Sequence, residues 1–317
     1  MPLAIGAVLF GVLCLWQAAD QFVEGATRLA LIFRLSPVVI GALIIGFGTS
    51  APELLVSSLA AAGGDVDVGV GNIIGSNIAN LSLILGAASL ILTMPIGPGA
   101  LRREAPLSVA AVVLFAICLR VGLGVTTGLI MLVALAGALW LIMRTTNDEL
   151  TAEVAELAGE AEHNAVTESA RTLIGMAFTV GGAWVLVWGA LDLADRLGVG
   201  GGFMGLTLVA IGTSLPELVT VIAAARAKQA ELIVGNLLGS NLFNSLAVGG
   251  SVSLLGSGPV VDRSLITQDA MLMTAVAVAA FVAMWTRRKF ERLEGLVLLT
   301  VFVGFLVYTY VSEGPAV

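Results

Sequence analysis

Long apolar runs separated by short polar loops extend along almost the whole chain. Each run approaches the ~20 residues that a helix needs to cross a bilayer, and none shows the alternation of a membrane β-strand. Only 12% of the residues are charged, against about 25% in a soluble domain. We therefore expect an all-α membrane protein. The predicted spans lie near residues 3–19, 37–62, 68–92, 105–121, 124–143, 172–191, 203–225, 232–255, 268–286 and 294–311.

The basic residues predict the orientation of these ten helices. If the N-terminus lies outside, twelve of the 15 lysines and arginines fall in loops on the inner side of the membrane. The remaining three are Arg120, Arg196 and Arg263. Because lysine and arginine are enriched on the cytoplasmic side, we expect a multi-pass protein of the cell (inner) membrane with both termini outside.

One polar segment, residues 145–170, connects the fifth span to the sixth. It contains seven acids and neither lysine nor arginine, and it lacks the ligand spacing and central glycine of an EF-hand loop. We expect a solvated acidic linker on the cytoplasmic side. The acids are Asp148, Glu149, Glu153, Glu156, Glu160, Glu162 and Glu168.

The chain contains one internal repeat. A shift of 164 residues (212 − 48) aligns residues 48–86 with residues 212–250 without a gap, and sixteen of the 39 positions are identical. Five predicted spans lie in each half, so the second copy enters the membrane from the opposite side. Residues 1–144 and 171–317 are therefore predicted to be two inverted five-helix repeats, a plan found in many secondary transporters.

A proline and a glutamate interrupt the second and the seventh span. Pro52 is followed by Glu53, and Pro216 is followed by Glu217. A proline inside a helix removes a backbone hydrogen bond, and a carboxylate at the bilayer centre costs about 2.5–3.5 kcal/mol on insertion scales. Two such acids facing each other repel unless a cation lies between them. The matched breaks therefore predict a cation site.

The residues around the breaks supply oxygen ligands. Carbonyls freed near Gly48 and Gly212 are hard ligands that suit Ca²⁺ and Na⁺. So are the hydroxyls of Thr49, Ser50, Thr213 and Ser214. In the next span of each half, polar residues recur every four positions and share one helical face. These are Asn72, Ser76 and Asn80, and Asn236, Ser240 and Asn244. The chain has two cysteines and one histidine, which leaves almost no ligands for a zinc site.

The motifs GTSAPE…GNIIGSNIAN and GTSLPE…GNLLGSNLFN resemble those of the Ca²⁺/cation antiporter superfamily, specifically the prokaryotic sodium/calcium exchanger family. The resemblance covers essentially the whole chain. It implies that Glu53 and Glu217 hold Ca²⁺ or, alternately, Na⁺, and that Thr49 and Thr213 add backbone carbonyls to the calcium site.

The resemblance also implies a role for the neighbouring residues. Asn80 and Asn244 would complete the middle of the site, although several relatives have an aspartate at position 244. The flanking sodium sites would be formed by Ser50, Ser76, Ser214 and Ser240 with the carbonyls of Gly46 and Ala210.

The sequence thus predicts a secondary antiporter that exchanges Ca²⁺ for Na⁺ by alternating access. It predicts no enzyme activity, no cofactor beyond the transported ions, and no obligate protein partner. Three alternatives remain: a proton-coupled antiporter of Ca²⁺ or another divalent cation, a cation channel, and an intramembrane hydrolase with paired acids. The driving gradient separates the two antiporters, strict coupling of fluxes separates an exchanger from a channel, and a hydrolase needs a water-activating group.

Overall fold

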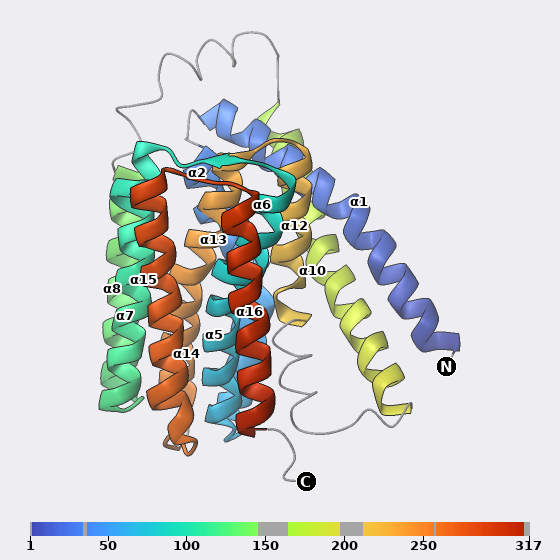
Figure 1. Ribbon diagram of the computed structural model, residues 1–317. Coiled ribbons are helices and arrows are strands. Elements are labelled where there is room, and N and C mark those ends of the chain that lie inside the picture. The colour runs from blue at the N-terminus through green and yellow to red at the C-terminus, as the bar shows by residue number, and fades with distance from the viewer. Residues whose placement is uncertain (1, 34–36, 145–163, 197–211, 257, 314–317) are drawn as a thin grey trace.

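Helices form nearly all of the described chain. A computed structural model describes residues 2–33, 37–144, 164–196, 212–256 and 258–313 (Figure 1). Within these ranges six helices are long and apolar enough to cross a membrane. The bent pair Val38–Thr49 and Ala51–Ala62 would be a seventh span. The expectation of a helical membrane protein is confirmed, whereas the count of ten spans as two inverted repeats stays a prediction.

The first half of the chain contains a series of helices, of which η1, η2 and η3 are single π-helical segments. In order these are α1 (Pro2–Phe33), α2 (Pro37–Ile40), η1 (Gly41–Ile45), α3 (Gly46–Thr49), α4 (Ala51–Ala62), α5 (Val66–Ala79), η2 (Asn80–Ile84), α6 (Leu85–Ile91), η3 (Ala100–Glu104), α7 (Ala105–Val121) and α8 (Val125–Arg144).

The second half repeats this series where it is described. Its helices are α10 (Ala165–Arg196), α12 (Leu215–Arg226), α13 (Ala230–Phe243), η4 (Asn244–Val248), α14 (Gly249–Leu255), η5 (Leu265–Asp269), α15 (Ala270–Arg287) and α16 (Arg292–Glu313). A short antiparallel pair, β1 (Met94–Pro95) and β2 (Lys289–Phe290), joins a loop of each half.

The bounds of four elements recur at the shift found in the sequence. α4 and α12 begin at residues 51 and 215, and α5 and α13 begin at residues 66 and 230, so both pairs differ by 164 (215 − 51, 230 − 66). The same shift relates η2 to η4 and α6 to α14. α1 and α10 also lie side by side (Figure 1). They run in opposite directions, as the contacts of Gly25 with Thr172 and of Gly189 with Ala4 show.

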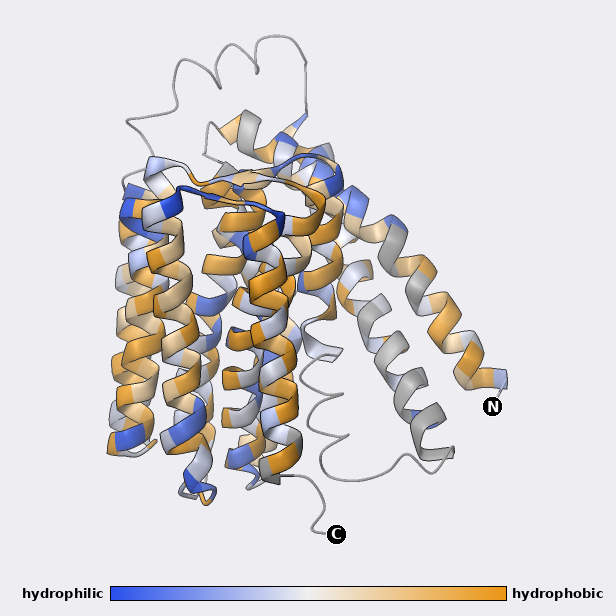
Figure 2. Cartoon of the chain, viewed as in Figure 1, coloured by the Kyte–Doolittle hydropathy of each residue, from blue (hydrophilic) through white to orange (hydrophobic). Residues whose placement is uncertain are grey.

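Burial separates a central group of helices from a peripheral one. The most apolar stretch of Ala230–Leu255 is fully buried (100%), and that of Val66–Ile91 is 83% buried, but only 11% of the stretch in Arg292–Thr309 is buried. Hydrophobic residues predominate along the outer helices, and hydrophilic ones gather at the helix ends (Figure 2). α5–α6 and α13–α14 therefore form the core, and α8 and α16 present apolar surface of the kind that lipid covers.

Two glycines allow the broken second span to reach this core. A Cβ at Gly235 would lie 2.1 Å from the Val38 carbonyl oxygen, and a Cβ at Gly239 would lie 2.5 Å from Ala42 Cα. The backbones of α2–η1 and α13 are therefore in direct contact, as small residues permit in membrane helices. This contact places the first break against the polar stretch of the other half.

Glu168 differs from the sequence prediction. We expected it in a solvated linker, but it lies in α10 with only 3% of its surface exposed. Its Oε1 accepts from Arg28 Nη1 at 2.9 Å, and its Oε2 lies 3.3 Å from Arg171 Nε. The bond to Glu168 raises the pKa of the Arg28 guanidinium. The rest of the predicted linker up to residue 163 lies outside the described residues.

Candidate cation site

The two helix breaks have the same backbone geometry. Ser50 separates α3 from α4 with φ −82° and ψ 7°, and Ser214 precedes α12 with φ −85° and ψ 5°. Pro52 and Pro216 follow in the first turn of the new helix, where a proline costs no intrahelical hydrogen bond. The break thereby places each glutamate in the first turn of a helix, where the helix dipole favours negative charge.

The two glutamates are held crosswise by serines of the opposite half. Ser50 Oγ donates to Glu217 Oε1 at 3.0 Å, and Ser214 Oγ donates to Glu53 Oε1 at 3.1 Å. The two bonds are related by the repeat, because Ser50 corresponds to Ser214 (214 − 50 = 164) and Glu53 corresponds to Glu217 (217 − 53 = 164). Glu53 is 1% exposed and Glu217 is fully buried. The breaks of the two halves therefore meet at one buried centre.

Polar residues of α5 and α13 surround this centre. Ser214 Oγ lies 3.2 Å from Ser76 Oγ, and Thr213 Oγ1 donates to Asn72 Oδ1 at 3.1 Å. Ser240 Oγ donates to the Gly46 carbonyl oxygen at 3.2 Å. Each of these three contacts joins residues from different halves of the chain. The predicted face of each partner helix thus lies against the break of the other half.

Other predicted ligands are less directly connected to the carboxylates. Thr49 Oγ1 donates to the Ile45 carbonyl of its own helix at 3.0 Å, and Asn80 Nδ2 donates to Asn241 Oδ1 at 3.0 Å. Asn244 is fully buried, and neither its Oδ1 nor its Nδ2 has a hydrogen-bond partner among the described residues. Ala210 lies outside the described residues.

The centre is rich in oxygen and contains unused acceptors. Within the described ranges, Glu53 Oε2, Glu217 Oε2 and Asn80 Oδ1 are buried without a hydrogen-bond partner. Those ranges also contain no group of three or more histidine, cysteine, aspartate or glutamate residues that could hold a metal. Two carboxylates with hydroxyl, amide and carbonyl oxygens are a ligand set that Ca²⁺ accepts, since it takes 6–8 oxygen ligands in flexible geometry.

The structure adds residues that the sequence interpretation left out. Asn77 Nδ2 donates to Ser245 Oγ at 3.2 Å, and Asn241 accepts from Asn80 across the halves. Asn77 and Asn241 lie off the face on which every fourth residue is polar, but they are identical between the repeats, and that identity was the available signal. Ser57 could not have been found in this way, because the residue at the matching position, 221, is a valine.

Two further acids are buried away from the breaks. Glu104 and Asp269 are the last residues of η3 and η5, and they are 2% and 3% exposed. Each lies at the start of a predicted span, near residues 105–121 and 268–286. Glu104 Oε1 pairs with Arg103 Nε at 2.8 Å.

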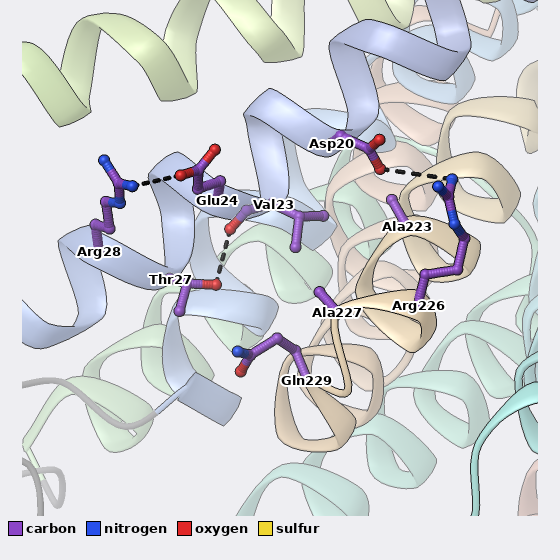
Figure 3. A pocket seen from close by; sticks show the side chains of 9 residues that line it. All are labelled: Asp20, Val23, Glu24, Thr27, Arg28, Ala223, Arg226, Ala227 and Gln229. Carbon is purple, nitrogen blue, oxygen red and sulfur yellow. Dashed lines mark hydrogen bonds and ion pairs between the residues drawn. The ribbon is translucent and has the colours of Figure 1, made fainter. Parts of the chain in front are cut away.

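A separate pocket of about 420 Å³, with charged residues in its lining, lies between α1 and α12 (Figure 3). Its charged residues are largely paired with one another. Asp20 Oδ1 lies 3.8 Å from Arg226 Nη1, and Arg28 pairs with Glu24. Acidic and basic side chains balance in this pocket, so it lacks the uncompensated negative charge of the Glu53–Glu217 centre.

The fold and the centre define a class: a helical membrane protein with a repeated helix break and an oxygen-lined pair of buried carboxylates. Residues 3–144 and 170–311 match the family described as sodium/calcium exchanger protein. The chain belongs to this family of membrane antiporters.

Known relatives cover nearly its whole length. The chain is 33% identical over 309 residues to the putative antiporter CaxA of Alkalimonas amylolytica, covering 94% of this chain and 96% of that protein. It is 34% identical over 320 residues to the inner membrane protein YrbG of Escherichia coli (strain K12), covering 97% and 96%. A solved structure of the sodium-calcium exchanger NCX_Mj, soaked with Na⁺ and Sr²⁺, superposes with a TM-score of 0.85 at 26% identity, covering 96% of this chain and 98% of that one.

Proposed function

We propose that this protein exchanges Ca²⁺ for Na⁺ across the cell inner membrane by alternating access. The crosswise bonds between Ser50 and Glu217 and between Ser214 and Glu53 are the observation that carries the proposal. They bring two carboxylates, each with a free Oε2, into one buried centre built equally from both halves. Another structure of the related exchanger NCX_Mj was soaked with Na⁺ and Ca²⁺, which supports the same choice of ions.

The charge of the centre favours exchange over simple binding. Two ionised carboxylates balance one Ca²⁺ or two Na⁺, so the two cargoes compete for the same groups. A centre left without a cation would keep two buried negative charges close together, which is costly. The change between the outward-open and the inward-open conformation is therefore disfavoured when the site is empty. Each such change requires that one of the two ions is bound.

We propose the ligands that the resemblance to the exchanger family implies. Glu53 and Glu217 hold Ca²⁺ or Na⁺ with the backbone carbonyls of Thr49 and Thr213, and Asn80 and Asn244 complete the middle. The flanking sodium sites use Ser50, Ser76, Ser214 and Ser240 with the carbonyls of Gly46 and Ala210. In the proposed plan of ten spans as two inverted five-helix halves, α1 and α10 move together past the core of α5–α6 and α13–α14.

Transport by purified protein in liposomes tests the proposal. An outward sodium gradient should drive ⁴⁵Ca²⁺ uptake, and Glu53→Gln and Glu217→Gln should each abolish it, because the amide removes the charge and keeps the shape. Glu291→Gln is the matched control, since Glu291 is 40% exposed and pairs with Lys289 at the surface; it should transport as the wild type does. Full uptake in either buried-site variant would overturn the assignment.

A proton-coupled divalent-cation antiporter is the second candidate. The free Oε2 of each buried glutamate can accept a proton as well as a cation. Replacing the sodium gradient by a proton gradient of equal driving force separates the two. Uptake driven by protons in sodium-free buffer would favour the second candidate.

A further inference from the structure

The two halves of the cation site are supported differently. In the first half, α4 and α5 form a hydrogen-bonded link to the break of the second half. Asn72 Nδ2 donates to Ser57 Oγ at 2.9 Å, and Asn72 Oδ1 accepts from Thr213 Oγ1 at 3.1 Å. Ser57 is fully buried and Asn72 is 2% exposed. Both ends of the Asn72 carboxamide are therefore used.

The matching link in the second half is not made. Asn236 corresponds to Asn72, but Asn236 Oδ1 accepts from Ser240 of its own helix at 3.3 Å. Asn236 Nδ2 is buried without a hydrogen-bond partner among the described residues. The position that corresponds to Ser57 is Val221, which is fully buried and has no hydroxyl. Thr49, the counterpart of Thr213, bonds to its own helix through Ile45.

The link ends next to a ligand of the proposed site. Thr213 precedes Ser214, whose hydroxyl donates to Glu53 Oε1 and lies against Ser76. Ser57 stands one helical turn after Glu53 in α4. Ser57, Asn72 and Thr213 thus connect the helix that bears Glu53 to the break that holds Glu53 from the opposite side.

An amide can be fixed only where its two ends meet different partners. Ser57 Oγ accepts from the Asn72 amino group, and the Asn72 oxygen faces Thr213. Without the Ser57 hydroxyl, the Asn72 amino group would lose its buried acceptor, and the carboxamide would be free to turn. A carboxamide that can turn would no longer hold the Thr213 hydroxyl in one place, which would weaken the support of the break.

We infer that Ser57 and Asn72 are positioning residues that fix the Thr213–Ser214 break, which holds Glu53, and that this support has no counterpart at Val221 and Asn236. This inference rests on the proposed function for the identity of the ion. Because Ca²⁺ gathers 6–8 oxygens at once, its binding depends on how closely those oxygens are held in place before it arrives. Loss of the Ser57 hydroxyl should therefore weaken Ca²⁺ binding more than it slows transport.

Ser57→Ala tests the inference. We expect the Ca²⁺ concentration for half-maximal uptake to rise roughly 3- to 10-fold, the effect of one buried hydrogen bond, with the maximal rate within about twofold of the wild type. Ser57→Thr keeps the hydroxyl and should restore the wild-type value. Val221→Ser is the matched control in the other half, where a hydroxyl would give Asn236 Nδ2 an acceptor; its half-maximal concentration should not rise.

Calcium binding measured without transport separates this inference from the proposed function. The readout is the Ca²⁺ concentration that gives half of the Ca²⁺-induced rise in thermal midpoint of the purified protein. If the wild type shows no response to Ca²⁺ in either assay, the proposed function fails. If the wild type responds and Ser57→Ala responds at the same concentration, the positioning role is refuted. An equal weakening by Ser57→Ala and Val221→Ser would also refute it, because the cause would then be packing.

Discussion

At the scale of single residues, the centre of the molecule is marked by buried polar atoms that have no hydrogen-bond partner among the described residues. Glu53 and Glu217 each receive one serine hydroxyl and keep one oxygen unused, and Asn244 has no hydrogen-bond partner for its side chain within the described chain. Buried polar atoms are normally paired. One unpaired oxygen on each of two buried carboxylates therefore points to a ligand that supplies positive charge.

Asn244→Asp tests whether position 244 faces the cation. Two carboxylates already balance one Ca²⁺, so a third would be protonated at low pH and would then resemble the asparagine. At higher pH it would ionise, add negative charge and strengthen the attraction for Ca²⁺. We expect the apparent Ca²⁺ affinity of the variant to rise with pH more steeply than that of the wild type between pH ~6 and ~8, because burial and the two neighbouring carboxylates keep the new aspartate protonated up to this range.

The measurement is ⁴⁵Ca²⁺ uptake at a series of Ca²⁺ concentrations and at each pH. Glu291→Gln again serves as the control, since it changes the charge of an exposed side chain. Identical pH profiles for the wild type and Asn244→Asp would place residue 244 outside the cation site.

At the scale of elements, close helix packing determines where the break lies. The first segment of the broken span, α2–η1, contacts α13 through Gly235 and Gly239, and a Cβ at either position would meet backbone atoms of Val38 or Ala42. Backbone cannot move aside as a flexible side chain can. The glycines therefore set the distance between the first break and Ser240, which donates to the Gly46 carbonyl.

Gly239→Ala should separate these two elements. The added methyl group would force a shift that costs about 1–3 kcal/mol, as overpacking of a buried contact does, and should lower both the thermal midpoint and the rate of Ca²⁺ uptake. Gly137→Ala in α8 is the matched control, because a Cβ there meets nothing within 4 Å. It should leave the midpoint unchanged or raise it, since alanine favours the helix by about 0.5–1 kcal/mol. A normal midpoint and normal uptake in Gly239→Ala would show that this contact is not tight.

At the scale of the whole molecule, the two halves depend on each other. α1 and α10 pack together in opposite directions, and α2–η1 of the first half packs on α13 of the second. Ion pairs between Arg28 and Glu168 and between Arg171 and Glu24 join α1 to α10 near one end. An odd number of spans in each half would explain this antiparallel pairing.

Cysteine labelling tests the predicted orientation. In a protein without Cys14 and Cys118, Val261→Cys places a thiol in a loop predicted to lie outside, and Ala227→Cys places one in a loop predicted to lie inside. Val261 is 78% exposed and Ala227 is also exposed, so both thiols would be accessible to solvent. A maleimide that cannot cross the membrane should label only the first in cells with a permeable outer envelope. The reverse pattern would invert the topology, and labelling of both would contradict the ten-span plan.

Local chemistry made much of this protein predictable from its sequence. Apolar runs long enough to cross a bilayer specify helices, because every backbone polar group must be satisfied within the segment. Proline specifies where two of these helices break, and the identity between residues 48–86 and 212–250 specifies that both breaks have the same form. The matching conformations of Ser50 and Ser214 confirm this.

Only the tertiary structure decided which residues of the two halves meet. Ser50 bonds to Glu217 over a separation of 167 residues, and Ser57, which matches Val221, bonds to Asn72 where no repeat signal marked it. The acidic segment around Glu168 predicts a solvated side chain. Glu168 is nevertheless buried, because two arginines, one from α1 and one from α10, pair with it. Periodicity and motif spacing fix what a residue offers along its own helix, but its partner depends on the packing of distant helices, which no local pattern encodes.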